Sequence, residues 1–225
     1  MPNFFSPDAY WEMLEPHLRR FSPDEQRAAI ALYRELAKGE AVDSARLANA
    51  LGISAAESAA LLDRDAIKSA IYRDGEGRVL GFGGLAVAPM HHRLKVNGRT
   101  LSTWCAWDSL FLPELLECSA EVASPDPQSG QLVQLVVTPE RIASVEPRDT
   151  VISFVRPDAG VFGTSAANVM AKFCHFIYFF ASQASGERWS EKNPGTFLSL
   201  LDDAFVLAKR FNRRNFGLAL ASLTP

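Results

Sequence analysis

The sequence has few cysteines, no excess of basic residues and no long apolar run. Its three cysteines among 225 residues are too few, and odd in number, for the disulfide framework of a small secreted protein. The formal net charge of −3 argues against a nucleic-acid-binding protein that relies on bulk positive charge. No stretch reaches the roughly 18–20 apolar residues that a membrane helix requires. We therefore expect a globular protein with free thiols.

The N-terminal residues do not resemble a signal peptide. They are aromatic but acidic, and Pro2, Pro7 and Pro16 interrupt them, whereas a signal peptide has a basic start and a continuous apolar segment. Hydrophobic residues make up 48% of the chain and charged residues 22%, an ordinary balance for a protein with a buried core. We expect a cytoplasmic protein.

Motifs of several common enzyme classes are also missing. The chain has no G-x-S-x-G nucleophile elbow, no G-x-x-x-x-G-K-[ST] phosphate loop and no H-E-x-x-H zinc motif. It has no C-x-x-C pair, which argues against standard zinc and thioredoxin-like sites. No helix-starting pattern follows the glycine-rich segment 81–84 closely. We expect this segment to let a strand twist or approach another backbone, rather than to bind phosphate.

Helix-starting signals dominate the first third of the chain. Two capping boxes, Ser22 with Glu25 and Ser54 with Glu57, each predict the start of a helix. A further short helix is predicted between them, over residues 44–50. This part of the chain is therefore predicted to be helical.

A β-hairpin is predicted next, around the turn residues 74–77. Three helices followed by a hairpin suggest a winged-helix-like unit over residues 1–85. Such a unit can bind DNA, but the helix that follows Ser54 carries one arginine, Arg64, among several acids, which is poor for contacts with phosphate. We interpret the unit as a packing or dimerising module and do not expect a nucleic-acid partner.

Residues 86–225 are predicted to form a mixed core of mainly antiparallel strands with helices, which makes the fold class α+β. The Asn97-Gly98 dipeptide between the short segments 94–96 and 99–101 is the strongest hairpin signal. The other predicted elements are a helix at 106–116, paired strands at 119–124 and 131–138, a helical turn at Thr138-Pro139, a strand at 151–155, a buried strand or bridge at 172–182, and an amphipathic helix at 196–214 with Phe197 and Leu200 on its apolar face.

Two of the three cysteines stand in settings that suggest chemistry. Cys105 precedes Asp108 by three residues, so both would share one face of a first helical turn if a helix begins there. The helix dipole would then favour the thiolate and lower the pKa of the thiol. Cys174 lies in an aromatic run. Both patterns also fit ordinary buried cysteines, which are common in protein cores.

Other candidate residues carry weaker signals. Cys118 is interpreted as filler or strand-edge surface outside the site. His91 and His92 are adjacent, and neighbours on a strand point to opposite faces, so we interpret them as surface or loop residues rather than as two ligands of one metal ion. His175 follows Cys174 and either assists it or simply packs beside it.

Two segments resemble a known family. TWCAWDSLFLPELL is similar to the first catalytic segment of the alkylmercury (organomercurial) lyases, with its W-C-A-x-D core. KFCHFIYFFAS is similar to their second segment, F-C-x-x-x-x-F-F-A-S. The similarity extends in the same order over residues 28–225. The two cysteine segments together are specific, because both members of a ligand pair match at once.

The resemblance implies roles for three residues. Cys105 and Cys174 match the family's two essential thiols, and Asp108 matches its essential carboxylate. His175 stands where some members carry another cysteine. The implied activity is cleavage of the carbon–mercury bond by protonolysis, which gives a hydrocarbon and Hg(II). The two thiolates bind mercury, because mercury(II) is a soft cation, and Asp108 transfers the proton and is a possible third ligand of Hg(II).

The resemblance also implies the partners of such an enzyme. These are an organomercurial substrate, an external small thiol that releases Hg(II), and a mercuric reductase that accepts it, with no organic cofactor. The aromatic residues Trp104, Phe173 and Phe176 are candidates for an apolar pocket around the organic group, although they fit a hydrophobic core equally well.

Two alternatives use the same thiols. One is a soft-metal (mercury) binding or sensing protein without turnover, in which the helical unit reads DNA; the acidic balance of the chain counts against it. The other is a related protein that acts on a different organometal or only sequesters metal. The sequence leaves this second alternative open, because the same thiols would serve both activities.

Overall fold

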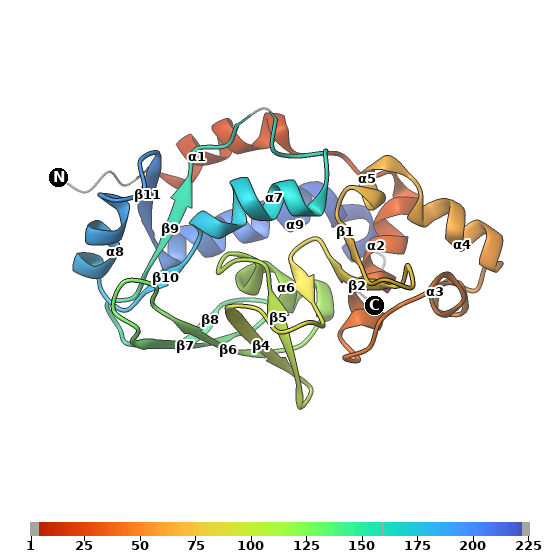
Figure 1. The fold of residues 1–225 in the computed structure, drawn as a ribbon, viewed down its shortest axis with the longest axis horizontal. Coiled ribbons are helices and arrows are strands. Elements are labelled where there is room, and N and C mark those ends of the chain that lie inside the picture. The colour runs from red at the N-terminus through yellow and green to blue at the C-terminus, as the bar shows by residue number, and fades with distance from the viewer. Residues whose placement is uncertain (1–4, 159, 222–225) are drawn as a thin grey trace.

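The computed structural model describes residues 5–158 and 160–221. The first residues of the predicted N-terminal unit and the last residues of the predicted core lie outside this description. The chain combines helices with a large antiparallel sheet, which confirms the α+β prediction (Figure 1). Among the described helices, we find none with the length and hydropathy of a membrane span.

The N-terminal helices begin where the capping residues predict. Ser22 and Glu25 form a capping box at the start of α2, and Ser54 and Glu57 form another before α4. Gly52, with a φ of 67°, ends α3 in the left-handed conformation that glycine adopts without strain. The helical elements of this part are α1 (Pro7–Leu14), η1 (Glu15–His17), α2 (Pro23–Leu36), α3 (Ser44–Leu51), α4 (Ala55–Leu62) and α5 (Asp65–Lys68).

The large sheet has the strand order β1-β2-β3-β5-β4-β6-β7-β8, and each pair of neighbours is antiparallel. Both predicted hairpins are present, and Asn97 and Gly98 adopt positive φ angles in the turn between β4 and β5. The strands are β1 (Ile71–Arg73), β2 (Val79–Phe82), β3 (Leu85–Ala86), β4 (His92–Val96), β5 (Arg99–Thr103), β6 (Ala120–Pro125), β7 (Leu132–Val137) and β8 (Ile142–Glu146).

A smaller sheet has the order β10-β9-β11. It confirms the predicted strand at 151–155, which is β9 (Val151–Val155), and pairs it with β10 (Phe179–Phe180) and β11 (Thr196–Leu200). The remaining elements are α6 (Asp108–Leu116), α7 (Ala166–Lys172), η2 (Cys174–Phe176), α8 (Gln183–Ser190) and α9 (Leu201–Ala221).

The predicted start of the C-terminal helix at residue 196 is wrong. Residues Thr196–Leu200 form strand β11, which pairs along its whole length with β9, and the helix begins at Leu201. Phe197 is buried within the strand, whereas Leu200 is 54% exposed. The spacing of the apolar residues fitted a helix, but pairing with a distant strand decides the structure here.

Two further predictions need correction. No helical turn follows Thr138; its hydroxyl accepts hydrogen bonds from the backbone N–H groups of Glu140 and Arg141 and closes a tight turn between β7 and β8. In the segment 172–182, Cys174 lies in the short 3₁₀ helix η2, and only Phe179–Phe180 form a strand.

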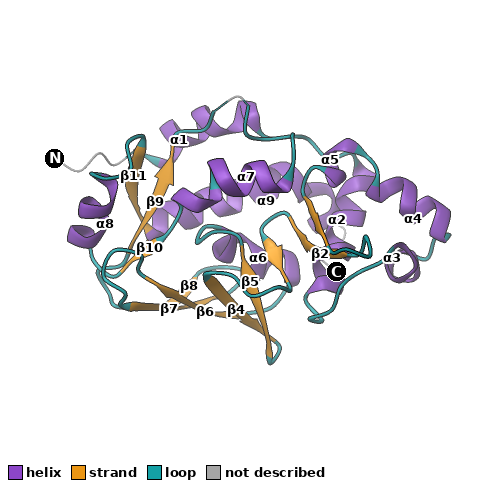
Figure 2. Ribbon diagram, viewed as in Figure 1, coloured by secondary structure: helices purple, strands orange, loops and turns teal. Residues whose placement is uncertain are grey.

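Helices α6 and α9 lie on the same side of the large sheet (Figure 2). Helix α6 contacts strands β6 and β7, and α9 contacts α6. Side-chain hydrogen bonds join these helices: the Trp107 indole donates to the Ala204 carbonyl at 3.1 Å, and the buried Asn212 amide donates to the Phe111 carbonyl at 2.9 Å. Helix α6 is therefore held firmly at the centre of the molecule, and its first residue, Asp108, belongs to the candidate site.

Candidate active site

The loop between β5 and α6 holds Cys105 in a fixed position. The Thr103 hydroxyl donates to the Cys105 carbonyl at 2.8 Å, and the Trp104 N–H donates to the Gly84 carbonyl at 2.9 Å. Helix α6 begins at Asp108, not at Ala106 as predicted, so the Cys105 thiol precedes the helix. The Asp108 carboxylate accepts a hydrogen bond from the Cys105 N–H at 2.7 Å. This contact closes the loop on itself.

Cys174 reaches the same place from a distant part of the chain. Helix α7 ends at Lys172, and η2 carries Cys174 back towards the loop after β5. The Ala106 N–H donates to the Ile177 carbonyl at 3.1 Å, which ties the two cysteine-bearing segments together. The backbone itself therefore fixes the relative position of the two thiols.

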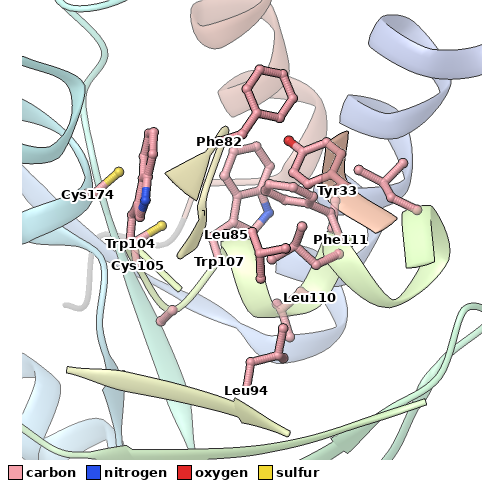
Figure 3. Close-up of a cluster of buried hydrophobic side chains, with 14 of the residues drawn as sticks. Tyr33, Phe82, Leu85, Leu94, Trp104, Cys105, Trp107, Leu110, Phe111 and Cys174 are labelled. Atoms are coloured by element: carbon pink, nitrogen blue, oxygen red, sulfur yellow. The ribbon is translucent and has the colours of Figure 1, made fainter. Parts of the chain in front are cut away.

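The structure brings the three predicted site residues together. One ligand atom each from Cys105, Asp108 and Cys174 lies within 4.8 Å of the other two. The exposed fractions of these residues are 0%, 6% and 4%. Figure 3 shows both cysteines at the edge of a cluster of buried aromatic and aliphatic side chains. In the described part of the chain, this is the one group of three such side chains close enough to hold a metal ion.

Burial controls the protonation of the three groups. It raises the pKa of the Asp108 carboxyl to about 7, although hydrogen bonds from Cys105 and from the Trp104 backbone lower it. Burial, followed by the interactions with Cys174 and Asp108, raises the pKa of the Cys105 thiol well above that of an ordinary thiol. The predicted lowering by the helix dipole is wrong for Cys105, because the thiol is buried and precedes the helix.

The second thiol has opposing influences. Its hydrogen bond with Cys105 lowers the pKa of Cys174, but burial and the charge of Asp108 outweigh this effect, and the pKa is raised. A carboxyl group with a pKa near neutrality beside two protonated thiols can accept and donate a proton at physiological pH. The site thus combines two soft metal ligands with a proton carrier.

An aromatic cavity of about 130 Å³ opens beside Asp108 and Cys174. Trp104 and Phe173, two of the aromatic residues predicted to line a pocket, contribute to its wall. Phe176 is half-buried and lies outside the described lining. The wall also includes Tyr33, Phe82, Gly83, Gly84, Trp107 and Phe111. An apolar group attached to a thiol-bound metal would find a largely apolar surface here.

The structure separates the remaining candidate residues from this group. His92 is 1% exposed and its Nδ1 atom lies 2.7 Å from the Ser124 hydroxyl, so the prediction of a surface or loop residue is wrong. The alternating burial of β4 places His92 on the buried face with Leu94 and Val96, and the alternation in HRLKV is the signal that could have shown this. Cys118 is half-buried and His175 is exposed, and neither belongs to the group.

Residues around Asp108 were missed by sequence reasoning. Gly84 lies directly against the Asp108 carboxyl group, and Tyr33 contacts the neighbouring residue Gly83. The glycine-rich segment was noted as a place of close approach, but its partners are far away in the sequence. No local pattern could have identified Tyr33, which belongs to an ordinary amphipathic helix.

The fold and the site together define an α+β protein with a buried pair of thiols and one carboxyl group, an arrangement suited to a soft metal. Residues 85–212 match the model of the alkylmercury lyase family. An alkylmercury lyase of Bacillus cereus is 33% identical over 183 residues, which cover 81% of this chain and 79% of that protein. The chain therefore belongs to the alkylmercury lyase family of enzymes, which confirms the resemblance seen in the sequence.

Two other comparisons agree. An alkylmercury lyase of Staphylococcus epidermidis is 37% identical over 141 residues, which cover 63% of this chain and 62% of that protein. The match thus spans less than two thirds of that relative. The crystal structure of the mercury-bound form of MerB2 superimposes with a TM-score of 0.69 and 24% identity, and covers 92% of this chain and 98% of that one. This likeness supports the fold.

Proposed function

We propose that the protein is an organomercurial lyase that cleaves the carbon–mercury bond by protonolysis and gives a hydrocarbon and Hg(II). The observation that carries the proposal is the buried group of Cys105, Asp108 and Cys174, whose ligand atoms lie within 4.8 Å of one another, in a chain that belongs to the alkylmercury lyase family. An organomercurial is the substrate that this family implies.

The two thiols capture the mercury. One thiol displaces the weakly held ligand of R–Hg–X, and its proton leaves with X. The second thiol then bonds to the same mercury atom and gives its proton to the Asp108 carboxylate. Mercury that carries two thiolates and one carbon is crowded, and the added electron density makes the carbon more basic. The soft thiolates suit this ion better than oxygen or nitrogen ligands do.

Asp108 completes the reaction. The carboxyl group delivers its proton to the carbon, the carbon–mercury bond breaks, and the hydrocarbon R–H leaves. Hg(II) stays on Cys105 and Cys174, with Asp108 as a possible third ligand. The pKa of about 7 supports this role, because a proton carrier acts best when its pKa lies near the working pH.

The aromatic cavity would hold the organic group. Trp104 and Phe173 line it beside Cys174 and Asp108, and an apolar wall holds the carbon side of the substrate against the acid. Phe176, which lies outside this described lining, is not part of the proposed pocket.

Release of the product requires a soft ligand from outside. An external small thiol would exchange with the two cysteines and remove Hg(II), and a mercuric reductase would accept it. We propose that the enzyme works without an organic cofactor, since the three side chains supply all the groups that the reaction needs. We also propose a cytoplasmic location.

The test is turnover of phenylmercury by the purified protein in excess small thiol, with benzene followed by gas chromatography. We expect many equivalents of benzene per protein. Stoichiometric binding of mercury without benzene release would instead identify a soft-metal binding or sensing protein. Asp108 would then be a metal ligand or have no part in the chemistry, and would not be a proton donor.

A further inference from the structure

The turn between β2 and β3 lies directly against Asp108. Gly84 has a φ of +101°, and a Cβ atom placed on it would lie 2.6 Å from Cγ and 2.7 Å from Oδ1 of Asp108. Both separations are too short for any side chain, so only glycine permits this contact. The other carboxylate oxygen, Oδ2, accepts the hydrogen bond from the Cys105 N–H. The carboxyl group is therefore held from both sides.

Helix α2 supports the other side of this turn. The Tyr33 hydroxyl donates to the Gly83 carbonyl at 2.8 Å. Gly83 has a φ of +46°, and a Cβ atom there would overlap the Tyr33 hydroxyl. Tyr33 is 1% exposed, and its ring packs against Phe82 with 4.9 Å between ring centroids. The hydroxyl thus contacts the turn with little room for movement.

Two backbone hydrogen bonds fix the ends of the turn. The Gly83 N–H donates to the Ala70 carbonyl at 3.0 Å, and the Gly84 carbonyl accepts from the Trp104 N–H at 2.9 Å. The second bond joins the turn to the residue that precedes Cys105. A continuous set of contacts therefore runs from Tyr33 through the turn to Asp108.

We propose that Tyr33 is a positioning residue, which holds the Gly83-Gly84 turn so that Gly84 sets the place of the Asp108 carboxyl beside the two thiols. The inference rests on the proposed function, in which Asp108 delivers the proton. A displacement of about 1 Å at a reacting group can cost about 100-fold in rate. The N-terminal helices then contribute to the reaction through this turn, although none of the three reacting side chains belongs to them.

The first test is Tyr33→Phe, which removes only the hydroxyl. Capture of phenylmercury is measured as loss of free thiols, and benzene release is measured in a single turnover. We expect unchanged capture and a rate of benzene release that falls about three- to tenfold, the effect of one lost hydrogen bond.

The matched control is Tyr10→Phe. Tyr10 is equally buried and donates to the Val155 carbonyl at 2.9 Å, which does not belong to the turn, and we expect its variant to release benzene within about twofold of wild type.

The second test is Gly84→Ala. Gly98→Ala is its control, because Gly98 also has a positive φ, +76°, but a Cβ atom there meets nothing within 4 Å. Both variants therefore carry backbone strain, and only the first displaces Asp108. We expect Gly84→Ala to capture phenylmercury and to release benzene about 100-fold more slowly, and Gly98→Ala to match wild type.

The outcomes separate the two proposals. Capture without benzene release by the wild-type protein would defeat the proposed function, and this inference with it. Normal turnover by wild type together with full-rate release by Tyr33→Phe would overturn this inference alone. An equal loss of capture and release in Tyr33→Phe and Tyr10→Phe would also overturn it, because such a result shows a general destabilisation of the fold and no specific effect on Asp108. If Gly84→Ala does not fold, Tyr33→Phe decides.

Discussion

Asp108 is a carboxyl group held away from water, and this burial affects the stability of the fold. Its pKa is about 7, against an ordinary value of 3.8. The folded protein therefore binds this proton more tightly than the unfolded chain does. The stability that the proton contributes is complete below pH 3.8 and is lost as the pH rises through about 7.

Asp108→Asn tests this dependence. Asparagine has nearly the same shape and no charge, so the variant avoids the cost of a buried carboxylate at high pH. We expect its free energy of unfolding to rise relative to wild type between about pH 4 and pH 8, by a few kcal/mol at most. Urea unfolding at several pH values measures this difference. A difference that stays constant with pH would contradict the raised pKa.

The two thiols permit a direct test of the site. We expect Cys174→Ser to reduce hydrocarbon release at least about 100-fold, because serine is a poor ligand for a soft metal, while the circular dichroism spectrum stays that of wild type. Cys118→Ser is the matched control, since Cys118 is half-buried and lies outside the group. Full turnover by Cys174→Ser would remove this residue from the site.

At the residue scale, sequence reasoning could predict part of the site. Cys105 and Asp108 are neighbours in the chain, so their proximity follows from local spacing. Cys174 was assigned through the family resemblance, because nothing local distinguishes it from a core cysteine. Folding of distant segments brings Gly84 against Asp108 and Tyr33 against Gly83, so no local pattern could show these contacts. The roles of all three predicted site residues stay predictions until they are tested.

At the scale of elements, the β4–β6 pair carries a buried histidine. His92 on β4 lies beside Ser124 on β6. Burial, with a smaller effect of His91, lowers the pKa of His92 well below its ordinary value of 6.5. The folded protein therefore keeps this ring neutral at pH values where the unfolded chain binds a proton.

His92 should consequently destabilise the fold in mild acid. As the pH drops below about 6.5, the unfolded chain gains a proton on His92 that the folded protein resists, so the free energy of unfolding decreases towards the lowered pKa. Asp108 contributes the opposite trend over this range in both proteins, so the effect is measured against His92→Gln. Urea titrations from pH 7.5 to pH 5.5 should show a loss of stability in wild type relative to this variant. His175→Gln, at an exposed position, should retain it. Equal slopes for wild type and His92→Gln would refute the explanation.

Local signals predicted helix starts well where a capping box is present. The capping boxes at Ser22 and Ser54 were predicted correctly because each involves residues within one turn of helix. The strand β11 was mistaken for helix because its short apolar run fits either period, and only pairing with β9 decides between them.

At the scale of the whole molecule, the predicted boundary at residue 85 stays a prediction. Contacts cross it at several points. Strands β1 and β2 continue through β3 into the large sheet. Tyr33 packs against Phe216 of α9, and the Arg214 guanidinium donates to the carbonyl groups of Leu18 and Arg19. We propose two regions, at 1–85 and 86–225, that share one core.

A shared core predicts a single unfolding transition. Because apolar contacts join the N-terminal helices to α9 and the sheet, neither region should unfold alone. Calorimetry should give one peak, with a calorimetric enthalpy equal to the van't Hoff enthalpy. Two resolved peaks, or an early transition reported by Trp11 in α1 but not by Trp107 at the N-cap of α6, would show that the regions unfold independently.

The distance along the chain between the two cysteines has one more consequence. Cys105 and Cys174 belong to segments that meet only through folding. A mercury ion held by both would therefore cross-link the chain and close a loop of the residues between them. Such a cross-link restricts the unfolded chain much as a disulfide does. The enzyme that still carries Hg(II) after the reaction would then be the form most resistant to heat and to proteases. Removal of the metal by a competing thiol would restore both its ordinary stability and its activity.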